Sequence, residues 1–131
     1  MEIIRTDTRA SRPADPEYFT GTVWHEPVIG EGAGTDVRAL RVTFAPGART
    51  AWHTHPRGQT LHVLSGVGRV ATRGGAVEVI REGDTVWIPP GEEHWHGAAP
   101  DRVMCHLAIQ ESVDGRTADW LDHVSDSDYA G

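Results

Sequence analysis

The sequence has one cysteine, few basic residues and no long hydrophobic run. Cys105 has no second cysteine to pair with, which excludes an internal disulfide and a metal site built from cysteines. Twelve Lys and Arg against 19 Asp and Glu give a formal charge of -7, which argues against nucleic acid and anionic membranes as partners. The opening residues MEIIRTDTRA carry charges without an apolar run behind them. We therefore expect no signal peptide and no membrane span, and a cytoplasmic protein.

The size and composition predict one domain. A chain of 131 residues has room for one hydrophobic core, so we expect a single domain over residues 1–131. Hydrophobic residues make up 38% of the sequence and include five Trp, enough to build that core.

The centre of the chain consists of short apolar or β-branched runs separated by Gly, Pro or Asp. This pattern predicts an all-β fold, a sandwich or a closed barrel. The predicted strands are residues 19–25, 37–45, 49–55, 59–64, 67–73, 76–80, 84–89, 93–97 and 102–111. In the tail, Trp120, Leu121 and Val124 recur at helical spacing and predict a short C-terminal helix packed on the barrel.

Two histidine pairs share one spacing: His53 with His55, and His94 with His96. Residues two apart on a strand face the same side of the sheet, about 7 Å apart along the backbone. If the two strands are neighbours, four imidazoles converge on one interior. Buried histidines each need a polar partner, and a divalent cation supplies one to several at once, so the pairs predict a metal site.

Strand alternation also sorts the remaining candidates. Gln59 lies six residues beyond His53, so it faces inward if the strand register survives the intervening residues, and His62 then faces outward. His106 and Gln110 share one face of the last predicted strand, but both of its faces are apolar enough for burial. The tryptophans predict packing: Trp52 and Trp95 point away from the histidines, and Trp87 fills the core.

Several of these residues carry a family resemblance. The spacing of Gly47, His53, His55, Gln59 and Gly66 resembles the first cupin motif, and that of Gly83, Pro89, Gly91 and His94 resembles the second. The resemblance implies a double-stranded β-helix, or jelly-roll barrel, whose metal-binding core spans residues 37–111, with Leu40, Val42 and Phe44 walling the pocket. The sequence departs from the family in two places. Gln59 stands where the usual ligand is Glu, and Ala98 stands where Asn often closes the second motif.

A narrower resemblance rests on the segments ARTAWHTHP, GQTL, GEEHWHGAAP, HLAI and DWLDHV. They are similar to bacterial cupin hydroxynitrile lyases, manganese-dependent enzymes that interconvert mandelonitrile with benzaldehyde and cyanide. The resemblance implies His53, His55, Gln59 and His94 as metal ligands and leaves His96 and His106 for proton transfer. Gln59 either ligates directly or hydrogen-bonds a ligand histidine. Mn²⁺ is implied, although nitrogen and oxygen ligands also suit Fe, Co, Ni and Zn.

The sequence leaves three functions open. A hydroxynitrile lyase would use the cation as Lewis acid and a neutral histidine as base on a small-molecule substrate. A metal-dependent dioxygenase that cleaves carbon bonds would use the same ligands, and a small-molecule-binding cupin would need no turnover. We also expect a homo-oligomer, a dimer or a tetramer, because exposed strand edges are often buried against another copy.

Overall fold

The computed structural model describes residues 1–131 and is nearly all β. A short 3₁₀ helix, η1 (Thr6–Thr8), precedes the strands, and one short α-helix, α1 (Asp126–Ala130), ends the chain. The strands are β1 (Arg12–Pro13), β2 (Phe19–Thr20), β3 (Val23–Ile29), β4 (Val37–Phe44), β5 (Arg49–Thr50), β6 (His53–Thr54), β7 (Gln59–Thr72), β8 (Glu78–Arg81), β9 (Thr85–Ile88), β10 (His94–Ala98), β11 (Met104–Glu111) and β12 (Asp119–Trp120). The prediction of an all-β chain with a short C-terminal helix is confirmed.

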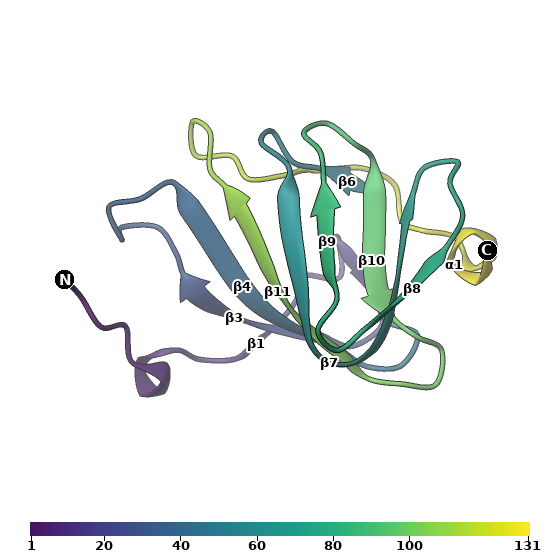
Figure 1. Cartoon of the computed structure of the whole chain (residues 1–131), viewed down its shortest axis with the longest axis horizontal. Coiled ribbons are helices and arrows are strands. Elements are labelled where there is room, and N and C mark those ends of the chain that lie inside the picture. The colour runs from purple at the N-terminus through teal and green to yellow at the C-terminus, as the bar shows by residue number, and fades with distance from the viewer.

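The strands form one antiparallel sheet that curls on itself, as Figure 1 shows. Its main path runs β1-β3-β4-β11-β7-β10-β5-β2, while β8 and β9 pair with β7, and β6 lies between β10 and β12. The N-terminal residues leave the curled sheet on the side opposite α1 (Figure 1). This topology brings β6, β10, β7 and β11 together, and these strands or the residues next to them carry all the candidate site residues.

The strand β7 is longer than the sequence predicts, because the expected turn at residues 65–66 does not interrupt it. Its first half pairs with β11 and β9, and its second half pairs with β10 and β8. Gly66 lies between the halves at a φ of 82° and pairs with Met104 of β11, and the register of β7 against β11 shifts just before it, between Val63 and Ser65. A Cβ on Gly66 would lie 1.9 Å from the Val103 carbonyl oxygen, so glycine is required where β7 bends from one half of the sheet to the other.

Two apolar clusters hold the fold together. The larger one fills the inside of the curled sheet and includes Phe44, Leu61, Val63 and Met104, all fully buried. The smaller one lies under α1 and contains Trp52, Ala71, Trp95, Val124 and Tyr129. The expectation that Trp52 and Trp95 serve packing is confirmed. Trp87 is 60% exposed on the outer face of β9, so the prediction that it fills the core is wrong.

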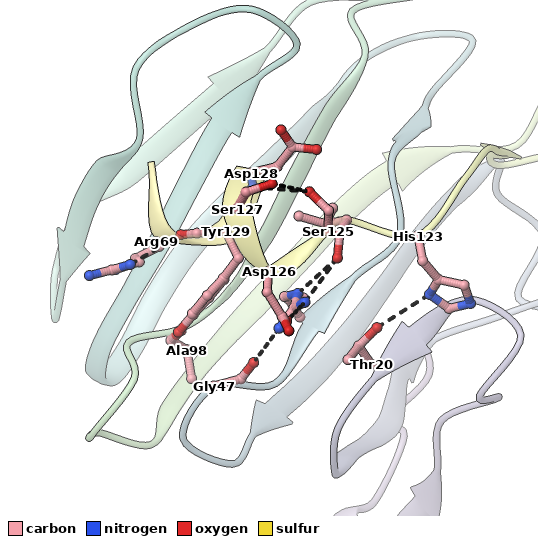
Figure 2. Close-up of polar contacts among 12 residues, drawn as sticks. Thr20, Gly47, Arg69, Ala98, His123, Ser125, Asp126, Ser127, Asp128 and Tyr129 are labelled. Atoms are coloured by element: carbon pink, nitrogen blue, oxygen red, sulfur yellow. Dashed lines mark hydrogen bonds and ion pairs between the residues drawn. The ribbon is translucent and has the colours of Figure 1, made fainter.

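The predicted C-terminal helix lies later in the chain than its spacing indicated. Trp120 belongs to β12, which pairs with β6, so backbone pairing overrides the helical spacing of the apolar residues. The true helix, α1, begins after Ser125, whose hydroxyl accepts a hydrogen bond from the Asp128 backbone N–H at 3.0 Å (Figure 2). Buried Arg49 holds the chain just before α1 by donating two hydrogen bonds to the Val124 carbonyl.

Tyr129 fixes α1 to the barrel (Figure 2). Its hydroxyl donates a 2.7 Å hydrogen bond to the carbonyl oxygen of Ala98 at the end of β10. Its ring lies between two guanidinium groups, 4.7 Å from that of Arg49 and 5.2 Å from that of Arg69. The tail is therefore attached at both ends, by β12 to β6 and by α1 to β10 and its neighbours.

Candidate metal centre

Five histidines and one glutamine meet inside the curled sheet. His53 on β6 lies directly opposite His94 on β10, and their ring centroids are 4.2 Å apart. His55 follows β6, and His96 lies two residues beyond His94 on the same face. The set is completed by His106 on β11 and Gln59 on β7. All six side chains are between 0% and 4% exposed, and the predicted convergence of the two histidine pairs is observed.

Backbone carbonyls fix the tautomer of three of these histidines. Nδ1 of His53 lies 2.9 Å from the Ala51 carbonyl oxygen, and Nδ1 of His94 lies 2.9 Å from that of Glu92. Nδ1 of His55 lies 2.6 Å from the Thr117 carbonyl oxygen. Because a carbonyl oxygen only accepts, each Nδ1 carries the proton and each neutral ring keeps its lone pair on Nε2. This is the orientation that backbone carbonyls impose on metal-binding histidines.

His96 has a different partner. Its Nδ1 lies 2.9 Å from Nε2 of His106, and neither Nε2 of His96 nor Nδ1 of His106 has a hydrogen-bond partner. Distance alone groups His96 with His53 and His94, since their ring nitrogens lie within 4.8 Å of one another. The carbonyl partners instead group His55 with His53 and His94. These three histidines share one tautomer, with Nδ1 on a backbone carbonyl, and Nε2 of His55 is buried with a free lone pair.

His94 and Gln59 form a contact that the protein alone does not satisfy. Nε2 of His94 lies 3.1 Å from the side-chain oxygen of Gln59. The one proton of neutral His94 is committed to the Glu92 carbonyl at Nδ1, so two acceptors face each other. Such acceptors repel unless a cation binds between them and makes both of them ligands. The donor set of neutral imidazole nitrogens and an amide oxygen fits a divalent transition metal.

Burial keeps these histidines neutral. It lowers the pKa of His94 and that of His106 to about 4, and it lowers the pKa values of His53 and His96 well below 6.5. Burial also lowers the pKa of His55, although the Thr117 carbonyl and Gln59 oppose this effect. Neutral imidazole is the form that binds metal, so the site is ready for a cation near pH 7.

A cavity of about 100 Å³ opens beside the histidines. Its polar wall includes His53, His55, His96 and the amides of Gln59 and Gln110, whereas His106 lies behind His96 and does not line it. Its apolar wall consists of Phe19, Leu40, Val42, Ala108, Ala118 and Trp120. The expectation that Leu40 and Val42 wall the pocket is confirmed. Phe44 does not line the cavity, so the expectation is wrong for this residue: its ring is fully buried in the core, 5.3 Å from that of His106.

The structure also places residues that the sequence left open or missed. The inward face of β11 carries His106 and Gln110, a choice that the sequence left open. His62 faces outward, as predicted, and its Nδ1 lies 2.9 Å from the Thr85 hydroxyl. Trp120 was not predicted at the site: its ring lies 4.6 Å from that of His53 and stacks on Tyr18. Its place depends on the pairing of β12 with β6, which no local sequence signal indicates.

Comparisons with known proteins agree with this geometry. A family model described as the Cupin domain matches residues 40–109. The chain is 54% identical over 129 residues to a curated (R)-mandelonitrile lyase of Granulicella tundricola, covering 98% of each chain. A crystal structure of a cupin-like protein from Thermotoga maritima superimposes with a TM-score of 0.85 at 40% identity, covering 89% of each chain.

A more distant structure shows the fold alone. The polyketide cyclase RemF of Streptomyces resistomycificus has a TM-score of 0.71 at 19% identity, covering 98% of this chain and 90% of its own. No helix of the structure is both long enough and apolar enough to cross a membrane. The matched motifs, the curled antiparallel sheet and the extended likeness to the mandelonitrile lyase lead to one conclusion: the chain belongs to the cupin family.

Proposed function

We propose that the protein is a metal-dependent hydroxynitrile lyase that interconverts an aromatic cyanohydrin with an aldehyde and cyanide. The observation that carries the proposal is the buried contact between Nε2 of His94 and the oxygen of Gln59, two acceptors that face each other beside the cavity. The 54% identity to a curated (R)-mandelonitrile lyase supports this reaction rather than another cupin reaction.

The proposed metal ligands are Nε2 of His53, His55 and His94 and the side-chain oxygen of Gln59. Mn²⁺ is the proposed ion, and Fe, Co, Ni and Zn suit the same donors. When bound, the cation supplies a Lewis acid whose charge four neutral ligands leave uncompensated, and it lowers the pKa of a substrate hydroxyl. The carbonyls of Ala51, Thr117 and Glu92 hold the three rings in the tautomer that presents Nε2.

His96 and His106 move the proton. His96 lines the cavity, and its unpartnered Nε2 accepts the hydroxyl proton of the cyanohydrin when its Nδ1–H donates to Nε2 of His106. The bond between the hydroxyl carbon and the nitrile carbon then breaks, and its electron pair leaves with cyanide as the carbonyl forms. The His96 imidazolium returns its proton to cyanide, so the histidine pair ends as it began. The apolar wall with Leu40, Val42 and Trp120 receives the organic group of the substrate.

The test is release of benzaldehyde from mandelonitrile without oxygen, at mildly acidic pH to suppress spontaneous decay. Manganese-loaded protein is compared with protein stripped by a chelator. The proposal predicts release that depends on metal and not on O₂, and equal rates in the two samples would contradict it. Product that forms only when O₂ is supplied would favour a dioxygenase instead.

We also propose that the protein assembles as a homo-oligomer, a dimer or a tetramer. Trp24 and Trp87 are 47% and 60% exposed on the outer face of the sheet, where a second copy would cover them. Light scattering after gel filtration measures the mass in solution. The 14.3 kDa mass of one chain would contradict this proposal.

A further inference from the structure

We propose that Gln110 is a positioning residue that turns the side-chain oxygen of Gln59 towards the metal centre. This inference rests on the proposed metal site and concerns how the protein prepares it. Gln110 lines the cavity, and its place between two strands lets it decide which end of the Gln59 amide faces His94.

The direction of the Gln110 amide is set by the backbone. Gln110 on β11 pairs with Arg38 on β4 on one side and with Gln59 on β7 on the other. Its Nε2 donates to the Arg38 carbonyl oxygen at 3.4 Å. Because that carbonyl only accepts, the NH₂ end of Gln110 faces β4, and its side-chain oxygen faces Gln59.

The direction of the Gln59 amide follows from that of Gln110. Nε2 of Gln59 donates to the side-chain oxygen of Gln110 at 3.0 Å, which leaves the Gln59 oxygen directed at His94. Both glutamines are less than 10% exposed, at 4% and 8%, so water does not substitute for either partner.

In the metal-free protein, the observed direction of the Gln59 amide leaves a favourable hydrogen bond to His94 unformed. A Gln59 amide turned by half a rotation would donate an N–H to the free lone pair on Nε2 of His94. It would then present an NH₂ group, which cannot bind a cation, at the metal centre. Turning would also bring the Gln59 oxygen against the Gln110 oxygen, and that repulsion opposes it. Gln110 thus keeps two acceptors facing each other until a cation binds between them.

Removing the acceptor at position 110 should therefore weaken metal binding. In Gln110→Met, a side chain of similar length has no oxygen for the Gln59 NH₂, and Gln59 turns to His94. We expect Mn²⁺ affinity to fall by about 10- to 100-fold, the usual cost of losing a group that orients a metal ligand. Gln110→Glu keeps an acceptor towards Gln59 and should bind Mn²⁺ at least as tightly as the wild type.

A second variant, Gln59→Glu, distinguishes a positioning role of Gln110 from a general structural effect of replacing it. In Gln59→Glu, both ends of the side chain are oxygens, so there is no amide left to orient. Adding Gln110→Met to Gln59→Glu should leave Mn²⁺ affinity undiminished. A merely structural effect of Gln110→Met would lower affinity by a similar factor in both backgrounds.

The experiment measures Mn²⁺ affinity of the four variants and the wild type by competition with a metal-sensitive dye, beside thermal unfolding of each metal-free protein. The proposal is supported if Gln110→Met lowers Mn²⁺ affinity when residue 59 is Gln but not when residue 59 is Glu. An equal loss in both backgrounds, or a tenfold or greater loss in Gln110→Glu, overturns it and leaves the metal site standing. Gln110→Glu keeps the test decisive if Gln110→Met does not fold. A wild type that binds no Mn²⁺ overturns both this inference and the metal-dependent function.

Discussion

The side-chain environment of each histidine, rather than its residue type, sets its role at the site. Carbonyl oxygens hold Nδ1 of His53, His55 and His94, whereas His96 and His106 hold each other at 2.9 Å. The first three rings therefore each present a lone pair on Nε2. The other two share a proton between them, and only His96 lines the cavity.

This division predicts separate effects of substitution. His96→Ala should lower kcat by about 10² to 10⁴, the usual value of a general base, and leave Mn²⁺ bound. His106→Ala should also lower kcat, because His96 then loses the partner that holds its tautomer. Steady-state kinetics and metal analysis of the purified variants measure both effects. Full activity in both variants would contradict the proton-transfer proposal, and loss of Mn²⁺ from His96→Ala would make His96 a ligand.

The sequence predicted these residues because strand alternation is a local property. Two residues on one strand face the same side whatever the rest of the fold does, so His53 with His55 and His94 with His96 were found together. Their partners come from other strands or from loops: Thr117 O lies 62 residues from His55, and Gln110 lies 51 residues from Gln59. No spacing rule links such positions, and strand alternation alone could not separate His55 from His96.

Among the elements, the tail contributes most to the site beyond the barrel strands. β12 pairs with β6, which carries His53, and the segment just before β12 supplies the Thr117 carbonyl to His55. Arg49 holds the far end of this tail through the Val124 carbonyl. The position of His55, a proposed metal ligand, thus depends on how firmly the tail is attached.

Two substitutions test which contact of Arg49 attaches the tail, the hydrogen bond to the Val124 carbonyl or the ion pair with Asp126. Arg49→Met removes a buried guanidinium that donates to Val124 O at 2.9 Å, and should lower the free energy of unfolding by about 2 to 3 kcal/mol. Asp126 also pairs with Arg49, but its side chain is fully exposed, so water screens the pair and Asp126→Asn should lower the free energy of unfolding far less than Arg49→Met. Urea denaturation of the metal-free variants measures both values. Equal effects would show that the ion pair, not the carbonyl, attaches the tail.

The bend in β7 at Gly66 should tolerate no side chain. A Cβ at position 66 would lie 1.9 Å from the Val103 carbonyl oxygen, so Gly66→Ala must displace backbone. We expect a loss of more than about 3 kcal/mol in the free energy of unfolding. Gly74→Ala is the matched control: its φ is also positive, at 80°, but no atom lies within 4 Å of the new Cβ. Gly74→Ala should lower the free energy of unfolding only by the cost of placing a non-glycine residue at positive φ, about 1 to 2 kcal/mol. Similar losses in the two variants would contradict the proposed role of Gly66.

Turn residues predicted most strand boundaries, and their failures have physical reasons. The Ser65 and Gly66 pair marks a bend within one strand, because β10 and β11 continue to pair with β7 on either side of it. The helical spacing of Trp120, Leu121 and Val124 covers too few residues to form a helix against the pairing of β12 with β6. In both cases a tertiary partner decided between two local possibilities.

For the whole molecule, five histidines in one interior couple stability to pH. Burial lowers the pKa of His94 and of His106 to about 4, from an ordinary value of 6.5. Above pH 6.5 both the folded and the unfolded states are neutral at these residues, so their contribution to stability is fully present. Between pH 6.5 and pH 4 the unfolded chain takes up protons that the folded protein does not, so the protein becomes less stable as the pH is lowered.

We therefore expect the metal-free protein to lose stability as the pH falls from about 6.5 towards 4, by about 1.4 kcal/mol per pH unit for each such histidine. Urea denaturation of chelator-treated protein at several pH values measures the slope. His106→Gln should reduce this slope, because it removes one of the buried histidines whose pKa is lowered. A stability that does not vary over this range would contradict the neutral state of the buried cluster.

The most direct measurement is X-ray diffraction from crystals of the manganese-loaded protein, with the ion located by its anomalous scattering. We expect one ion per chain, bound by Nε2 of His53, His55 and His94 and by the side-chain oxygen of Gln59, with His96 beside it and hydrogen-bonded to His106. An ion bound by His96 in place of His55 would contradict the proposed division between ligands and proton carriers. The absence of any ion from the cluster would contradict the metal centre itself.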